Sequence, residues 1–309
     1  MGEPLSDIIA LLRPRTVFSK GISGAGRWGV RYSEFGEPSF CAVLEGACRL
    51  AVDGAPAIAL EAGDFVLLPA TPGFTMSSEI APAAPTRLDP RAPVATGGEL
   101  RHGRPDGPPD VRLLGGYFVF DSPDAALWVS LLPALVHVRG VARLATLVRL
   151  VGEESLAERP GRELVLGRLV EVMLIEALRS TTAADTPPGL LRGLGDPQLG
   201  AALRRMHDAP ERAWTVVELA RAAGLSRSVF FERFSRTVGL APMAYLLSWR
   251  MALAKALLRR RELDVAEVAE RVGYGSASTF STAFRRHVGE PPSRYARGDA
   301  RPSSGLTAA

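Results

Sequence analysis

Similar side chains occupy equivalent places in two segments near the C-terminus. The first segment reads ELARAAGLS over residues 218–226, and the second reads EVAERVGYGS over residues 267–276. Each has the pattern of a short amphipathic helix that ends at a glycine turn, followed by a serine that can cap the next helix. A helix, a tight turn and a second helix make a helix-turn-helix motif, which inserts its second helix into the major groove.

The similarity between the two segments continues downstream with a constant spacing of 50 residues. The residues repeated in order are Phe230, Phe234, Gly239, Pro242 and Tyr245, then Phe280, Phe284, Gly289, Pro292 and Tyr295. An ordinary all-α domain would explain phenylalanines four residues apart. It would not explain why caps, glycine turn and Gly-x-x-Pro-x-x-Tyr recur together. We therefore predict an all-α domain with two helix-turn-helix motifs over residues 197–298.

In the first copy, the second helix is expected to run from Ser226 to Val238, with its phenylalanines facing inward. The opposite, groove-facing side would carry Arg227, Ser228, Phe231 and Glu232, with Arg236 placed for a phosphate. Arginine can bind guanine through two hydrogen bonds, glutamate can accept one from cytosine, and phenylalanine can contact a thymine methyl. We expect this copy to determine base specificity.

In the second copy, the corresponding helix spans about residues 277–287, and small hydroxyl side chains face outward. The candidate DNA-contacting residues are Ser278, Thr279, Ser281, Thr282, Arg285 and Arg286. Small hydroxyls discriminate bases poorly, so we expect this copy to contact phosphates. Between the copies, residues 242–260 have the pattern of one helix of about 28 Å, close to the roughly 34 Å of one B-DNA turn. The two recognition helices could then enter successive major grooves.

Positive charge is concentrated in the region of the repeat. Residues 211–298 contain 15 Arg and Lys against 8 Asp and Glu, whereas residues 1–210 contain 21 against 24. A local basic excess is the electrostatic pattern of a polyanion-binding domain. The sequence has neither an apolar run long enough to span a bilayer nor a secretory signal pattern, so we expect a cytoplasmic protein with no membrane partner.

The first 124 residues have the pattern of a small β-barrel or β-sandwich. The predicted strands, which flank a tight hairpin at Asp53-Gly54, are residues 28–32, 40–44, 47–52, 57–60 and 65–69. Residues 81–110 are rich in Pro, Gly and Ala and are predicted to form a long loop, and residues 111–120 are predicted to return to the sheet.

Helical periodicity begins at about residue 125. Apolar residues then recur every three or four positions as far as residue 182, which predicts amphipathic helices. The helix around 162–180 could cover the barrel or join two chains, and we favour the dimer seam. Residues 183–196 have the composition of a linker, and residues 299–309 are predicted to be a disordered tail.

Residues 267–295, which read EVAERVGYGSASTFSTAFRRHVGEPPSRY, resemble the AraC/XylS family of bacterial transcription regulators, and the match extends over 197–297. Arg250 and Ala254 also fit the family pattern. Residues 5–180 resemble, more loosely, the cupin-type sensor domain of one branch, through LSD at 5–7, VLEG at 43–46, LEAGDFVLLP at 60–69 and LGGYF at 114–118. The resemblance implies a DNA-binding activator or repressor, often a dimer, that senses a small molecule or stress. An activator would also have RNA polymerase as a partner.

The chain departs from the cupin pattern at its metal-binding histidines, where it has Cys41 and Phe74. Of the ligand set only Glu45 remains, and none of the four histidines has ligand spacing to it. We therefore predict no bound metal, no other cofactor and no enzyme activity. A cupin-type enzyme fused to a DNA-binding domain is the less favoured alternative, because the chain also lacks a phosphate loop and a nucleophile motif.

The side chains expected to line the barrel are Phe40, Cys41, Leu44, Phe65, Leu67 and Phe74. This lining is apolar, which indicates an aromatic or lipophilic effector unless the barrel is packed solid. A second hypothesis is that Cys41 senses oxidants or electrophiles. That role would need an accessible thiol with a lowered pKa, which the sequence does not reveal.

Overall fold

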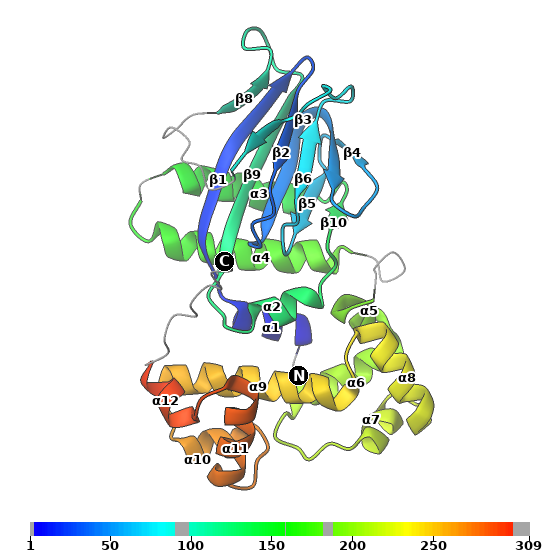
Figure 1. Ribbon diagram of the computed structural model, residues 1–309, viewed down its shortest axis with the longest axis vertical. Helices are drawn as coiled ribbons and strands as arrows, with labels where there is room; N and C mark the ends of the chain where they lie inside the picture. Colours follow the sequence, from blue (N-terminus) through cyan, green and yellow to red (C-terminus); the bar gives the residue numbers. More distant parts are fainter. Residues whose placement is uncertain (1–2, 90–98, 158, 182–187, 299–309) are drawn as a thin grey trace, which may run out of the picture. The chain divides into compact units, whose positions relative to one another are not determined.

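The computed structural model describes residues 3–89, 99–157, 159–181 and 188–298 of the chain (Figure 1). The chain divides into two compact units, Ile8–Leu191 and a second unit that joins Met1–Asp7 to Arg192–Ala309. The first contains the strands and the second is helical, so the predicted α+β architecture is confirmed. The tail predicted at 299–309 lies outside the described residues.

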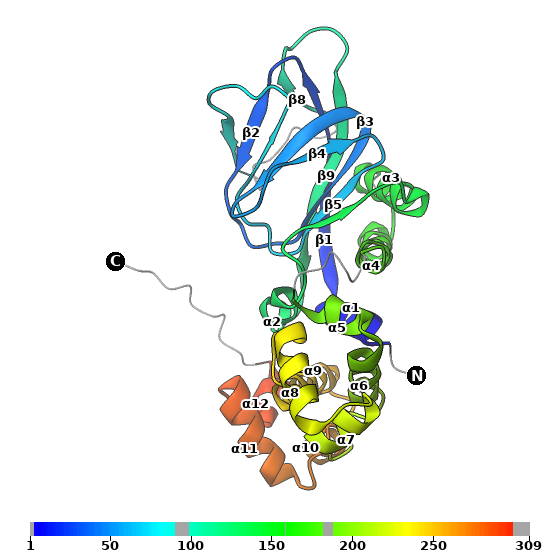
Figure 2. The same cartoon turned by 90° about the vertical axis from the view of Figure 1, so that its right-hand side faces the viewer.

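The described part of the first unit contains a ten-stranded sheet that curls into a half-open barrel (Figure 2). Its strands are β1 (Pro14–Ala25), β2 (Gly29–Tyr32), β3 (Ser39–Val52), β4 (Ile58–Glu61), β5 (Phe65–Leu68), β6 (Phe74–Ser77), β7 (Thr86–Leu88), β8 (Leu100–Gly103), β9 (Val111–Phe120) and β10 (Val136–Val138). The hydrogen-bonded order is β7-β2-β6-β3-β9-β1-β8. Strands β4 and β5 also pair with β3, and β10 pairs with β5.

Strand β3 carries the sheet around the curl. Its first half pairs with β9 and β5, and its second half pairs with β4 and β6. The register against β9 shifts between Val43 and Glu45. Directly after this bulge, Gly46 has a φ of +75°, and a Cβ there would collide with the carbonyl oxygen of Asp110. The VLEG segment therefore marks the bend, where only glycine fits.

Strands are present at the places predicted between residues 28 and 69 and at 111–120, but the two strands predicted at 40–44 and 47–52 are one continuous strand, β3, with a bulge between them. Strands β3 and β4 pair as predicted. The prediction of an uninterrupted loop over 81–110 was wrong, because β7 and β8 lie in it as short parallel partners of β2 and β1. Strand β1 was missed altogether. Its sequence, PRTVFSKGISGA, mixes Ser, Lys and Gly with apolar residues and lacks a clean alternation.

This unit contains α2 (Ala125–Ser130), α3 (Ala142–Leu156) and α4 (Arg162–Arg179), with the greater part of α1 (Pro4–Leu12) and the first two residues of α5 (Leu190–Gly195). Helices α3 and α4 lie along the outer face of the sheet, against β1 and β9 (Figure 2). The apolar stripe of α4, with Val170 and Met173 fully buried, is therefore used to cover the barrel. A dimer seam remains a prediction, and the apolar side chains left exposed on α4 are Leu164, Val165 and Val172. The predicted helical pattern was wrong at Val136–Val138, which forms β10.

The second unit contains most of α5 (Leu190–Gly195). Its other helices among the described residues are α6 (Pro197–Asp208), α7 (Val216–Ala222), α8 (Arg227–Val238), α9 (Pro242–Arg260), α10 (Val265–Arg271), α11 (Ala277–Val288) and α12 (Pro292–Arg297). Within it, α7 and α8 lie towards the start of the long helix α9, and α10 to α12 lie towards its end (Figure 1). Helix α5 occupies part of the predicted linker, because Leu190 is buried there rather than solvated. Among the described residues, every helix is too short or too polar to cross a membrane.

Candidate DNA-binding surface and effector cavity

The first helix-turn-helix motif consists of α7 and α8 with the predicted caps. Thr215 and Glu218 form a reciprocal capping box at the start of α7, and the hydroxyl of Ser226 accepts from the backbone N–H of Val229 at the start of α8. Each cap satisfies an amide that the first helical turn leaves without a partner. Between the helices, Gly224 has a φ of +65°, so the predicted glycine turn is confirmed.

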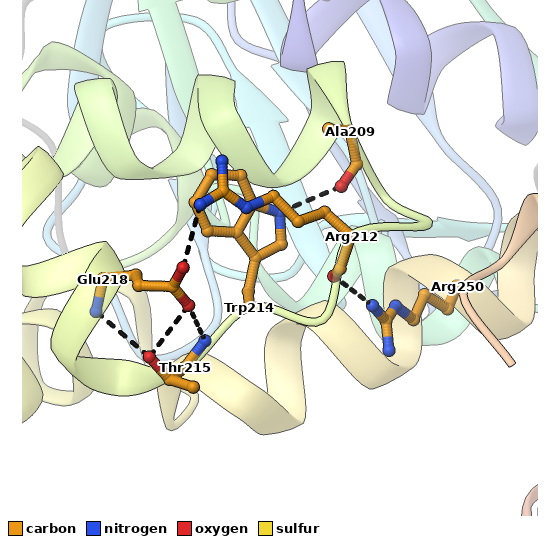
Figure 3. Close-up of polar contacts among 6 residues, drawn as sticks. All are labelled: Ala209, Arg212, Trp214, Thr215, Glu218 and Arg250. Carbon is orange, nitrogen blue, oxygen red and sulfur yellow. Dashed lines mark hydrogen bonds and ion pairs between the residues drawn. The ribbon is translucent and has the colours of Figure 1, made fainter. Parts of the chain in front are cut away.

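The loop before α7 is held by a cluster of polar contacts that the sequence analysis missed (Figure 3). The guanidinium of Arg212 lies 4.1 Å from the ring centroid of Trp214 and donates to Glu218 over 2.8 Å. This hydrogen bond, together with those from Thr215, lowers the pKa of the Glu218 carboxyl. The indole N–H of Trp214 donates to the carbonyl oxygen of Ala209 over 2.9 Å. The cluster thereby fastens the start of α7 to the end of α6.

The inward face of α8 is apolar. Phe230, Phe234 and Val238 are fully buried, with the two phenylalanine centroids 5.5 Å apart and Phe234 edge-on to Tyr245. On one flank, Arg233 donates to Gln198 over 2.7 Å and also to Asp196, the N-cap of α6. Partial burial opposes ionisation of Asp196, but hydrogen bonds from Leu199 and Arg233 lower its pKa. These contacts fix the orientation of α8 within the unit.

The outward face of α8 carries the five candidate residues. All of them are exposed: Arg227, Ser228, Phe231, Glu232 and Arg236. Phe231 is 47 % exposed, next to the fully buried Phe230. A large apolar side chain in a polar, exposed helix face fits a surface that a partner covers. DNA contact by these five residues remains a prediction.

The second motif consists of α10 and α11 and has the same construction. Asp264 and Glu267 form a capping box, and Ser276 accepts from the backbone N–H of Thr279 over 3.2 Å. Phe280 and Phe284 are fully buried, as predicted. The glycine turn is at Gly273, with a φ of +80°. Asp264 was not predicted, although its place three residues before Glu267 is the pattern of a capping box.

The candidate residues of α11 differ from those of α8 in their freedom to contact DNA. Ser278, Thr279, Thr282, Arg285 and Arg286 are exposed, but Ser281 is partly buried. The hydroxyls of Thr279 and Ser276 lie 2.9 Å apart, and Thr282 donates to the carbonyl oxygen of Ser278 over 3.1 Å. Two of the four hydroxyl side chains expected on this face are therefore already hydrogen-bonded within or beside their own helix.

Helix α9 connects the two motifs with the 19 residues predicted, or about 28 Å. Arg250, in its middle, donates from Nη2 to the carbonyl oxygen of Arg212 over 2.7 Å (Figure 3). Its Nε donates to the carbonyl oxygen of Pro210, also over 2.7 Å. A Cβ on Gly273 would collide with the carbonyl oxygen of Glu211 and with Arg250. The loop of the first motif, the middle of α9 and the turn of the second motif thus pack at one place.

Inside the half-barrel is a cavity with about 640 Å³ of space free of protein atoms, solvent at its mouth included. Of the six residues predicted to line it, Phe40, Cys41 and Phe74 are among the lining residues, but the ring of Phe40 stacks with Phe65 and Phe118 instead of facing the cavity. Leu44, Phe65 and Leu67 are not among its lining residues. Leu44 is 49 % exposed, and Phe65 and Leu67 are buried on the other face of β5. The prediction of these three as lining residues was wrong. For Phe65 and Leu67 the reason is that β5 is buried on both faces, so its sequence does not distinguish inside from outside. Leu44 lies in β3, where the register against β9 shifts.

Two features of this unit bear on the alternative chemistries. Burial raises the pKa of the Cys41 thiol and raises that of Cys48 to about 12, in each case with a smaller effect from a neighbouring group. A thiol with a raised pKa is a poor nucleophile at neutral pH. Nowhere in the described residues do three His, Cys, Asp or Glu side chains gather as they would around a metal ion.

The comparisons with known proteins agree with this arrangement. Residues 3–183 match the cupin family, and residues 219–298 match the helix-turn-helix domain family. An AraC-like transcription regulator of Streptomyces lividans is 38 % identical over 302 residues, which cover 95 % of this chain and 97 % of the relative. The chain belongs to the AraC family of transcription regulators.

A second AraC-like regulator, from Streptomyces antibioticus, is 38 % identical over 300 residues and 95 % of this chain. Among solved structures, the DNA-binding domain of AdpA in complex with a target DNA is 32 % identical. The aligned region covers 33 % of this chain and 92 % of the AdpA chain, with a TM-score of 0.31. As an AraC-family regulator, the present protein binds DNA through its helical unit. Its Streptomyces relatives are named as regulators rather than as enzymes.

Proposed function

We propose that this AraC-family regulator recognises its operator chiefly through α8, while α11 anchors the protein on phosphates. One contrast supports this division. The side chains of Arg227, Ser228 and Glu232 make no hydrogen bond to any other described residue and are exposed on α8. On α11, the hydroxyls of Thr279 and Thr282 are already engaged. Free donors and acceptors at the start of a recognition helix are what base readout requires.

Selection of duplexes from a random library, followed by sequencing, tests the division of roles. Wild-type protein is expected to enrich one block of strongly preferred bases, and a second block about one helical turn away with weak preference. Glu232→Gln should change the preferred base at a single position, because an amide donates as well as accepts. Thr282→Val, the matched change on α11, should leave the motif unchanged. A motif rewritten by Thr282→Val and untouched by Glu232→Gln would contradict the proposal.

We further propose that the barrel cavity binds a small effector and that this binding changes the affinity for DNA. The cavity is lined mainly by apolar and aromatic side chains, as small-molecule sites commonly are. An effector acts by binding one of two conformations more tightly. Met76 lines the cavity, and Met76→Trp would fill part of it. We expect this variant to bind operator DNA in vitro but to lose induction of a reporter gene in cells.

We infer that the protein is not an enzyme, and stoichiometric iron, manganese or zinc in the purified protein would reopen that question. A homodimer is supported by the exposed Leu164 on α4, because a partner chain would cover this apolar side chain. Sedimentation of Leu164→Glu should give a lower mass than that of wild type. If the protein activates transcription, RNA polymerase is a further partner, which in vitro transcription from the selected operator would detect.

A further inference from the structure

The cavity of the half-barrel has walls made largely of aromatic rings. Tyr32 and Phe74 stack with their centroids 4.8 Å apart, and Tyr117 lies 5.4 Å from Phe18 and 5.5 Å from Phe35. All five rings belong to the lining. Such walls favour the apolar body of a ligand through contact area and ring stacking, and they offer few partners to a sugar or another polyhydroxylated molecule.

The polar side chains of the lining share one property. They are the ammonium group of Lys20, the hydroxyls of Ser39, Tyr32 and Tyr117, and the thiol of Cys41. Each of these groups can donate a hydrogen bond, and none carries a negative charge. Burial raises the pKa of Tyr32 to about 12, so its hydroxyl keeps its proton at neutral pH. The lining is therefore suited to a ligand that presents an acceptor, and an anionic acceptor most of all.

Lys20 is the charged group of this lining. It lies in β1 directly opposite Gly115 of β9, in a register that places Cys41 of β3 on the far side of the same glycine. Because Gly115 has no side chain, nothing from β9 fills the space between the lysine and Cys41. The ammonium group is 5.9 Å from the ring centroid of Phe18. The side chain of Ile22 lies over Gly115, with its Cδ1 3.0 Å from where a Cβ would be. The strand thus presents a cation to the interior of the half-barrel.

No carboxylate among the described residues pairs with Lys20. Burial lowers the pKa of Lys20. The pKa of His102 is also lowered, by burial first and then by the positive charge of Lys20. A half-buried ammonium without a counter-ion is unfavourable, and an anion supplied by a ligand would relieve that cost.

We propose that the cavity binds an apolar carboxylic acid, with the ionised carboxylate held by Lys20 and the aromatic or aliphatic body against the aromatic walls. This inference rests on the proposed role of the cavity as an effector site and gives that effector its chemical class. Neutral lipophiles lack the charge that Lys20 requires, and apolar cations would be repelled by it.

The chain contains only two lysines, Lys20 and Lys255, which makes the contact directly observable. Full-length protein labelled with ¹³C at lysine Cε gives two side-chain signals, and Lys20→Arg assigns them by removing one. Titration with 2-naphthoate is expected to shift the Lys20 signal and leave the Lys255 signal in place. The isosteric neutral probe, 2-naphthamide, should shift the Lys20 signal much less. Decanoate and decanamide form the matched aliphatic pair.

Calorimetry on the same probes gives the affinities. At pH 7 at least one of the two acids should bind at least tenfold more tightly than its amide. Lys20→Met, which keeps the length of the side chain, should weaken acid binding at least tenfold and leave amide binding within threefold. Lys20→Arg, which keeps the charge, should retain most of the preference. Melting temperatures of the variants show whether a loss arises from misfolding, and the wild-type comparison of acid with amide stands without any variant.

The outcomes separate this inference from the proposed function. Equal binding of acid and amide, unaffected by Lys20→Met, would overturn the carboxylate while keeping an effector cavity. No binding of any of the four probes would overturn the proposed ligand class, and binding unchanged by Met76→Trp would show that the cavity is not the site. Operator binding by the helical unit is measured separately and does not depend on any of these results.

Discussion

Nδ1 of His207 lies 3.1 Å from a carboxylate oxygen of Asp7, 200 positions away in the sequence. Nε2 of the same ring lies 2.9 Å from the hydroxyl of Tyr245, and the ring stacks on Trp249 at 4.0 Å. Because a carboxylate only accepts hydrogen bonds, we assign the proton of the neutral ring to Nδ1, so that Nε2 accepts from Tyr245. The N-terminal residues are thereby fastened to α6 and α9.

This histidine should make the helical unit sensitive to acid. Burial lowers the pKa of His207 below the ordinary value of about 6.5 for histidine and outweighs the opposing effect of Asp7. As the pH falls below about 6.5, the unfolded ring takes up a proton before the folded ring does, so the free energy of unfolding should decrease. Well above that pH the contribution of His207 is constant.

Hydrogen exchange of α6 and α9 peptides across a urea series at pH 7.5 and 5.5 measures this change. His207→Asn should be less stable at pH 7.5 and should lose less on acidification, and equal losses in both proteins would contradict the assignment.

Two adjacent phenylalanines of α8 should respond in opposite ways to truncation. Phe230→Ala removes a fully buried ring and should lower the free energy of unfolding by about 3–5 kcal/mol. Phe231→Ala removes a ring that is 47 % exposed, so we expect little change in stability and a clear loss of operator affinity. Urea denaturation and fluorescence anisotropy with operator DNA measure the two effects. Full affinity in Phe231→Ala would remove this residue from the DNA-binding surface.

The helix-turn-helix motifs could be predicted from sequence because their determinants are local. Ser226 and Ser276 cap amides three residues away, and the buried phenylalanines repeat at one helical turn. Contacts between distant segments carry no such signal. Nothing near Arg250 in the sequence indicates that it binds the carbonyl oxygens of Pro210 and Arg212, some 40 positions earlier.

The barrel was less predictable for a different reason. In β5 all four residues are buried, so hydrophobicity does not reveal which side faces the cavity. Lys20 was not considered as a lining residue, because β1 lacks the alternation that marks a strand and a lysine in such a segment is most often solvated. Only the pairing of β1 with β9 brings it to the interior.

The two arginines proposed for different tasks should differ in their dependence on DNA sequence. Arg227→Ala is expected to weaken operator binding by about 1–3 kcal/mol and to relax preference at one base position. Arg286→Ala should weaken operator and random DNA alike and reduce the slope of log affinity against log salt by about one. Anisotropy titrations on both duplexes at several salt concentrations make the comparison. Equal losses of operator and random binding in Arg227→Ala would show that it contacts phosphate instead.

Arg250 should matter for DNA binding although we place it away from the DNA-contacting face. Its two hydrogen bonds hold the loop of the first motif beside the turn of the second, so Arg250→Ala should loosen one motif relative to the other. We expect reduced operator affinity, and faster hydrogen exchange in peptides covering residues 209–214. Arg260→Ala, at an exposed position of the same helix, removes the same charge and is the matched control. A similar loss in both variants would assign the effect to charge rather than to the loop contact.

Cys41 should behave as an inert lining residue. Burial raises the pKa of its thiol, so very little thiolate is present at pH 8, and alkylation by iodoacetamide should be at least tenfold slower in native than in urea-unfolded protein. Since oxidants attack the thiolate, Cys41→Ser should leave any reporter response to peroxide or hypochlorite unchanged, as should Cys48→Ser, the matched change at the other thiol. Rapid modification of native Cys41, together with a response lost in Cys41→Ser and kept in Cys48→Ser, would instead support the sensor hypothesis. That result would require a second conformation in which the thiol leaves its apolar surroundings, because the described one stabilises the protonated form.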